Sequence, residues 1–337
     1  MKPVYYSEYL QLDKILNAQE AESAKNGVRA DDEMLFIIIH QSYELWFKQM
    51  LHEVGIVREI FMKQNIEDNS ADMYTCVHRL KRVTIILQML VDKLSILETM
   101  TPLDFLDFRD FLRPASGFQS IQFKIMEALL GLPFDQRFGQ HYYTSQLNQG
   151  DIDKVKEAES AISLFSLVDQ WLTRMPFLKD SAYWNSENDF FTNYRAIYEA
   201  SLQEGEKQNL AAFDEMFMKQ PEETTRRLGV ESNRATLFIM LFRDFPLLNQ
   251  PYQFINLLLE IDQLLAQWRY RHVNMVQRMI GRRIGTGGST GAHYLKNAAD
   301  SHYIFKEFAD LTSFLVQRSK VPALPEALSN VLGYSKK

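Results

Sequence analysis

Cysteine is almost absent from this 337-residue chain, since Cys76 is its one cysteine. A single thiol excludes an intrachain disulfide framework, a thiolate zinc site and an iron–sulfur cluster. The Cys-x-x-Cys-His sequence that attaches c-type haem covalently is absent as well. We therefore interpret Cys76 as an ordinary helix residue.

Glycine and proline are also scarce, with 14 and 10 residues. Both fall below average usage of about 7% and about 5%, which favours long helices over many short strands. Hydrophobic residues make up 46% of the chain, enough for a sizeable core. We see no internal repeat or low-complexity linker, so we expect an all-α fold with one domain, residues 1–337.

The chain also lacks an excess of basic over acidic residues and a long apolar run. The formal net charge of −6 argues against general nucleic-acid binding, which needs a basic face. The apolar run at residues 34–39 is far shorter than the roughly 18 residues of a membrane span. The first residues contain no signal-peptide apolar region, so we expect a cytoplasmic protein.

Three long helices are predicted from apolar residues that recur at spacings of three and four. The first covers residues 31–62 and is expected to be capped by Asp31 or Asp32. The second covers residues 72–98. The third, residues 252–281, has the strongest pattern.

Shorter helices are expected between these. Thr101 followed by Pro102 is typical of a helix start, and that helix should end near Pro114. Another helix is expected over about residues 119–130. Residues 150–220 are more polar and predict a more variable helical region.

The seven histidines are the candidates for metal chemistry, but familiar protein-only metal patterns fail on their spacing. None has Glu three residues before it, none begins His-Glu-x-x-His, and none is followed two residues later by a carboxylate. The Gly-x-Ser-x-Gly sequence of serine hydrolases is matched only at residues 287–291, after a predicted helix and not after the strand that a serine nucleophile elbow needs. Residues 285–291 are glycine-rich but lack the ending of a phosphate loop. They are either a connector or a set of N–H donors that closes over a carboxylate or haem propionate.

Two histidines lie in apolar stripes of predicted helices. His272 lies on the buried face of the strongest helix, and His40 lies one turn after Phe36. Each is either a hydrogen-bonded core residue or a functional imidazole. For His272 the functional alternative is an axial ligand of haem iron, with arginines nearby for the propionates. The flanking arginines are Arg269, Arg271 and Arg278.

Phe105 and Arg109 stand four residues apart and share one helix face. Arg109 is either a surface residue paired with Asp104, Asp107 or Asp110, or a guanidinium beside an aromatic wall. The second arrangement binds an amino-acid carboxylate next to an aromatic side chain.

Five segments resemble, in the family's order, the motifs of tryptophan 2,3-dioxygenase, a haem dioxygenase family. Together they are highly specific. The segments are YSEYLQLD (6–13), EMLFIIIHQSYELWFK (33–48), PASGFQS (114–120), WRYRH (268–272) and GTGGS (285–289).

The resemblance implies a single-domain helical bundle that encloses a b-type haem, ferrous in the active form. It implies O2 insertion across the indole C2–C3 bond of L-tryptophan, which gives N-formylkynurenine, the first step of the kynurenine pathway. It also implies a homotetramer, a dimer of dimers, in which residues 1–20 reach a neighbouring subunit. Two alternatives are a related haem enzyme acting on a modified indole or tyrosine-like substrate, and a haem-free helical assembly protein.

The resemblance also implies roles for single residues around the indole ring. His272 would be the axial ligand of the haem iron. His40 would hydrogen-bond the indole N–H on the opposite side, positioning the ring without deprotonating it. Phe36 and Phe105 would form walls around the ring, and Arg109 would pair with the substrate carboxylate.

The remaining implied roles lie at the edge of the pocket. Ser116 would lie near the haem, and Thr286 would meet the ammonium or carboxylate group of the substrate as the glycine-rich stretch closes. Tyr6 and Tyr9 would complete the pocket of a neighbouring subunit. Position 105 is tyrosine in many bacterial members of the family, so Phe105 removes a hydroxyl from this pocket.

Overall fold

The computed structural model describes residues 3–63, 70–134, 145–185, 189–219, 226–286 and 292–333. Within these ranges the regular elements are α-helices and short 3-10 helices, which confirms the all-α class. None of the helices in the described ranges is both long and apolar enough to cross a membrane.

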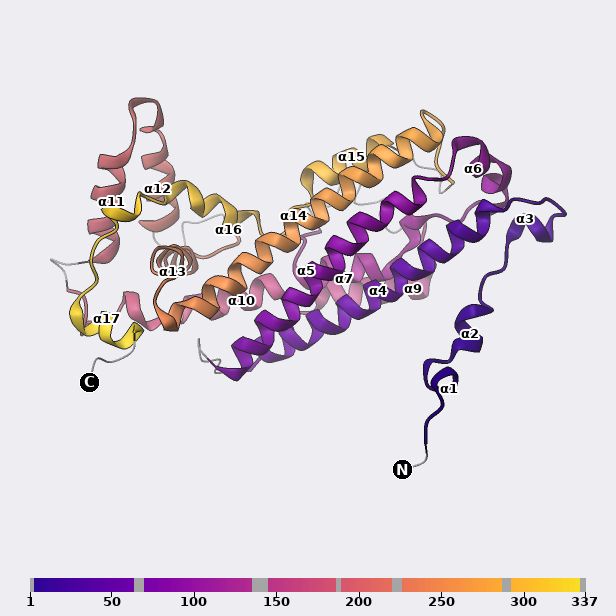
Figure 1. Ribbon diagram of the computed structural model, residues 1–337. Coiled ribbons are helices and arrows are strands. Elements are labelled where there is room, and N and C mark those ends of the chain that lie inside the picture. The colour runs from indigo at the N-terminus through magenta and orange to yellow at the C-terminus, as the bar shows by residue number, and fades with distance from the viewer. Residues whose placement is uncertain are drawn as a thin grey trace.

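Three long helices form the framework of the molecule (Figure 1). They are α4 (Asp32–Phe61), α5 (Ala71–Leu97) and α14 (Pro246–Ile280). α5 packs against both α4 and α14 along its length. All three were predicted from the apolar spacing. α14 begins earlier than predicted because Pro246 occupies the first turn, where a proline costs no hydrogen bond.

The predicted cap of α4 is wrong. Asp31 precedes the helix but makes no capping hydrogen bond; its carboxylate pairs with Arg29, 2.9 Å from Nε. Asp32 is already the first helical residue. α5 has a true cap, since Ser70 accepts a hydrogen bond from the Met73 amide at 3.2 Å.

The interior between the long helices is apolar. Val54, Leu80 and Leu258 are fully buried at facing positions of the three helices. Each such side chain contributes roughly 1.5–3 kcal/mol by leaving water. One hydroxyl enters this layer: Tyr43 of α4 donates to the Leu90 carbonyl of α5 at 2.6 Å. This packing gives a rigid frame on which site residues can be held.

Two short helices complete the wall next to the frame. α6 (Pro102–Arg109) starts at the predicted position, and Thr101 forms a capping box with Asp104. It ends at Arg109 and continues as a 3-10 turn, Asp110–Leu112. α7 (Ile121–Leu130) follows a second 3-10 turn, Gly117–Gln119.

The remaining helices cover the frame and form one end of the molecule. In Figure 1, α11, α12, α13 and α17 gather at that end, beside the C-terminus, whereas α15 lies along α14. Their bounds are α9 Gln149–Ser160, α10 Leu164–Thr173, α11 Phe190–Ser201, α12 Asn209–Phe217, α13 Val230–Leu241, α15 Ala292–Ser301, α16 Lys306–Asp310 and α17 Glu326–Leu332.

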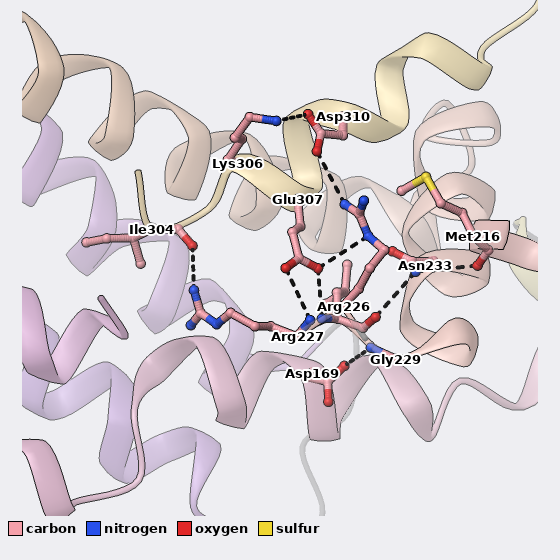
Figure 2. Close-up of polar contacts among 11 residues, drawn as sticks. Asp169, Met216, Arg226, Arg227, Gly229, Asn233, Ile304, Lys306, Glu307 and Asp310 are labelled. Carbon is pink, nitrogen blue, oxygen red and sulfur yellow. Dashed lines mark hydrogen bonds and ion pairs between the residues drawn. The ribbon is translucent and has the colours of Figure 1, made fainter. Parts of the chain in front are cut away.

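A polar cluster joins α10, α13 and α16 (Figure 2). The Glu307 carboxylate accepts from the amides of Arg227 at 3.2 Å and Leu228 at 2.9 Å. It also lies 3.6 Å from the Arg226 Nε. Asp169 accepts from the Gly229 amide at 2.9 Å. We call these residues the Glu307 cluster, and they fix the chain just before α13.

The N-terminal segment extends away from the rest of the molecule (Figure 1). It contains α1 (Tyr6–Leu10), α2 (Leu12–Leu16) and α3 (Glu22–Lys25). Neither α1 nor α2 contains a buried residue. Isolated helices this short are unstable in water, so α1 and α2 need a surface to pack on.

Candidate active site

A cavity of about 300 Å³ opens between α4, α6, α7, α14 and α15. Most of its wall is apolar, with aromatic rings from four of these helices. The structure brings together seven of the nine residues that the sequence predicted for the site. They are Phe36, His40, Phe105, Arg109, Ser116, His272 and Thr286.

Tyr6 and Tyr9 do not line this cavity. Their exposed fractions are 70% and 74%, and both belong to α1. Within one chain these tyrosines are therefore separate from the site.

His40 is held in a defined orientation by its own helix. Its Nδ1 lies 2.7 Å from the Phe36 carbonyl oxygen. A carbonyl only accepts, so Nδ1 carries the proton and Nε2 is left as an acceptor. Burial lowers the pKa of His40, which keeps the ring neutral at neutral pH. The ring also contacts Phe36, with ring centres 4.1 Å apart.

His272 lies on the opposite helix, α14, and its ring stacks on Trp268 at 5.2 Å, nearly parallel at 8°. Burial, and then the nearby His40, lower its pKa to about 4. The imidazole is therefore neutral at pH 7 and has a lone pair to donate. Within the described ranges, no group of three or more His, Cys, Asp or Glu side chains could hold a metal ion.

Arg109 ends α6 and is only 4% exposed. Its guanidinium donates to the Ile284 carbonyl, while its buried Nε has no hydrogen-bond partner in the described part of the chain. Burial, and then repulsion from Arg113, lower its pKa, but a guanidinium stays charged at any physiological pH. A buried cation beside a cavity is a strong site for an anion.

Two of the three aspartates that could have neutralised Arg109 have other partners. Asp104 caps α6 through Thr101, and Asp110 pairs with Arg113 at 3.4 Å. Among the described residues no carboxylate forms an ion pair with Arg109. The surface alternative for this arginine is therefore wrong.

The aromatic wall near Arg109 comes from α4 and α6. The ring centres of Phe36 and Phe105 are 5.8 Å apart, and both contact Phe108. Ser116 begins the turn before α7, where its hydroxyl accepts from the Phe118 amide at 3.3 Å. These elements leave an apolar, aromatic-walled slot next to a positive charge.

The arginines expected to serve haem propionates have other partners. Arg269 donates to Glu127 at 2.7 Å and to the His302 carbonyl at 2.8 Å. Arg271 forms a two-point pair with Glu98, with distances of 3.1 and 2.8 Å. Both therefore tie α14 to neighbouring elements, and a role toward haem propionates stays a prediction.

Sequence reasoning missed two charged residues of the cavity wall. Lys124 is 6% exposed, with its ammonium 3.9 Å from the Phe118 ring centre, and Glu127 is 4% exposed. They stand three residues apart in α7, a helix that is otherwise largely apolar. Charged residues inside an apolar pattern are the signal that could have found them.

Known proteins resemble this chain over nearly its whole length. The tryptophan 2,3-dioxygenase family pattern matches residues 1–315. A tryptophan 2,3-dioxygenase of Alteromonas mediterranea is 42% identical, covering 99% of this chain and 98% of the relative. That of Dictyostelium discoideum is 40% identical, with coverages of 99% and 89%. Tryptophan 2,3-dioxygenase B of Danio rerio is 39% identical, with coverages of 95% and 84%.

The chain belongs to the tryptophan 2,3-dioxygenase family. The resemblance inferred from five short segments is thereby confirmed. Of the motifs shared with tryptophan 2,3-dioxygenases, the glycine-rich stretch is only partly described. Gly285 and Thr286 line the cavity, whereas residues 287–291 lie outside the described residues.

Proposed function

We propose that this protein is a haem-dependent tryptophan 2,3-dioxygenase, which inserts O2 across the indole C2–C3 bond of L-tryptophan and releases N-formylkynurenine. The observation that carries the proposal is the buried guanidinium of Arg109, which pairs with no carboxylate among the described residues and lies beside an aromatic-walled slot. An amino acid with a large aromatic side chain matches both features. The family and its relatives support the reaction.

The residues fit a haem better than a bare metal ion. His272 brings one neutral, buried nitrogen donor to an apolar wall. A porphyrin supplies four further nitrogens, so one histidine suffices to hold its iron. Met275 and Val276 lie on the same wall and exclude water from the cofactor faces. When bound, ferrous haem supplies the O2 activation that no side chain provides.

The chain's own residues bind and orient the substrate. Arg109 pairs with the carboxylate, and a charge-assisted hydrogen bond of this kind is worth roughly 1.5–3 kcal/mol. Phe36 and Phe105 form aromatic walls against which the indole ring lies. Thr286 stands near the amino-acid end of the slot and adds a hydroxyl to its polar contacts. Fixing the ring in this way converts a collision into a positioned step.

Nε2 of His40 accepts a hydrogen bond from the indole N–H, because Nδ1 is already bonded to the Phe36 carbonyl. Indole N–H is a very weak acid, and burial has already made His40 a weak base. Full proton transfer to His40 is therefore unfavourable. The role that fits is positioning, with the proton staying on the indole nitrogen.

The deciding experiment is a single-turnover assay. The purified protein, loaded with hemin and reduced without oxygen, is mixed with L-tryptophan and 18O-labelled O2. We expect N-formylkynurenine carrying both labelled atoms, identified by mass spectrometry. Free indole should react poorly because it lacks the carboxylate that Arg109 binds. If the protein does not bind hemin, or turns over indole and L-tryptophan at equal rates, the proposal is wrong.

The same proposal includes a homotetramer, a dimer of dimers, in which Tyr6 and Tyr9 complete a neighbour's pocket. Supporting it, α1 is exposed and rich in aromatic residues. A second apolar surface lies along α5, where Ile85 and Ile96 are 60% and 46% exposed. Large exposed apolar surfaces on a soluble enzyme are typical of subunit contacts.

Two broader features belong to the proposal. Residues 1–337 form one domain, supported by α14, which packs against α5 and also against α13, α16 and α17. A cytoplasmic location suits Cys76, because burial raises the pKa of this thiol to about 12 and leaves it unreactive.

A further inference from the structure

The N-terminal segment is fastened to α4 by a buried carboxylate. Glu33 is fully buried in the first turn of α4. Its Oε1 accepts the amide of Glu22 at 2.8 Å, and its Oε2 accepts the amide of Ser23 at 2.9 Å. Both oxygens are therefore used to hold the first turn of α3. Amides that donate to a buried carboxylate form short, directional bonds, so this joint has a defined angle.

A second fastening lies two turns further along α4. The Gln41 amide nitrogen donates to the Ala18 carbonyl at 2.9 Å. Its amide oxygen accepts from the Gln19 side chain at 2.7 Å. Gln41 thus fixes residues 18 and 19, and Glu33 fixes residues 22 and 23. Together the two residues form what we call the arm clamp.

The arm clamp separates two parts of the chain with different environments. From Glu33 onward, α4 enters the core and carries Phe36 and His40, which lie between the two clamp residues, to the cavity wall. Before it, α1 and α2 have no buried residue, and Val4, Tyr5 and Leu16 are about as exposed as the two α1 tyrosines, at 70%, 70% and 68%. Figure 1 shows these helices pointing away from the body. The direction of the arm is thus set where it leaves α4.

We propose that Glu33 and Gln41 are positioning residues that aim the N-terminal arm of one copy at the pocket of another copy of this chain. The inference rests on the proposed role of Tyr6 and Tyr9. A loosely tethered arm would lose conformational entropy each time it docks. A two-point clamp removes part of that loss in advance and raises the local concentration of the arm at the neighbour's pocket.

The test compares two carboxylates of the same segment. Glu33→Ala removes the clamp, whereas Glu20→Ala removes an exposed carboxylate that pairs with Lys25 at 3.1 Å. For Glu33→Ala we expect KM for L-tryptophan to rise about tenfold, with kcat and haem content unchanged. Glu20→Ala should match the parent protein.

Mixed oligomers separate aiming from a general loss of structure. A His272→Ala subunit has an intact arm and clamp but should not turn over substrate. Co-assembled with Glu33→Ala subunits, it donates a properly aimed arm to their pockets, so KM should return toward the parent value. An elevated KM without rescue would overturn the inference. If Glu33→Ala yields no folded protein, Gln41→Leu removes the second fastening and is tested in the same assay. The same rise in KM and the same rescue are expected.

A deletion of residues 2–16 distinguishes this inference from the proposal beneath it. A raised KM in the deletion but an unchanged KM in Glu33→Ala would refute the clamp and leave the arm's role intact. An unchanged KM in the deletion would refute the role of the arm itself. If KM rises in the deletion and in Glu33→Ala, and His272→Ala subunits rescue each, the results support the clamp and the role of the arm.

Discussion

The cavity and the Glu307 cluster use similar side chains in opposite ways. In the cluster, the Glu307 carboxylate accepts two backbone amides and lies beside the guanidinium of Arg226 (Figure 2). In the cavity, Arg109 has no carboxylate partner among the described residues and keeps a buried Nε without an acceptor. Leaving a buried charge unpaired costs stability, so a fold that retains one needs a compensating ligand. The comparison separates a charge that stabilises the fold from a charge that we propose binds the substrate.

The largest effect is expected from His272→Ala, which removes the one nitrogen donor proposed for iron. We expect loss of bound haem and of turnover. His40→Ala should retain haem and measurable activity, because His40 contributes one neutral hydrogen bond. Soret absorbance and product formation measure both properties. If the two variants were equally inactive with haem retained, the division of roles between the histidines would be wrong.

Arg109→Ala tests the unpaired charge directly. Losing a charge-assisted hydrogen bond of roughly 1.5–3 kcal/mol should raise KM for L-tryptophan about tenfold to a hundredfold. The folded state should change little in stability, because the substitution breaks the hydrogen bond to the Ile284 carbonyl but no protein ion pair, and it also removes a buried charge. Arg113→Ala is the matched control, since Arg113 is exposed and pairs with Asp110. Initial rates and thermal unfolding supply the readouts, and an unchanged KM would remove Arg109 from the binding site.

Glu307→Gln tests the paired region and should give the opposite result. The amide cannot accept from both Arg227 and Leu228 or balance the charge of Arg226, so we expect a loss of about 1–3 kcal/mol in unfolding free energy. KM should stay the same, because the cluster does not line the cavity. Glu204→Gln, in an exposed pair with Lys207, should cost less than about 1 kcal/mol. Denaturant unfolding measures the loss in unfolding free energy. A change in KM would contradict the prediction, because it would link the cluster to the site.

Much of the fold and of the candidate site could be predicted from the sequence, for physical reasons. Apolar spacing places α4, α5 and α14 correctly because burial of one helix face dominates their stability. The motifs predict Phe36, His40 and His272, and the spacing from Phe105 singles out Arg109. The fold brings these residues to one cavity.

The partners of charged side chains could not be predicted. Arg269 stands one turn before His272, yet its partner, Glu127, is 142 positions away in sequence. Asp31 looked like a cap, but Arg29 competes for its carboxylate. Such pairings depend on tertiary geometry and not on local spacing.

The smallest effect concerns how burial sets the charge of the cavity. In the unfolded chain His272 has a pKa near 6.5, whereas burial lowers its folded pKa to about 4. As pH falls through this window the unfolded chain takes up the proton first, so the haem-free protein should lose stability. At pH 5.5 the loss is about 1 kcal/mol. Denaturant unfolding of haem-free parent and His272→Leu proteins at pH 7.5 and 5.5 measures it. The parent should lose more stability than the variant, and equal losses would show that His272 is not held neutral by burial.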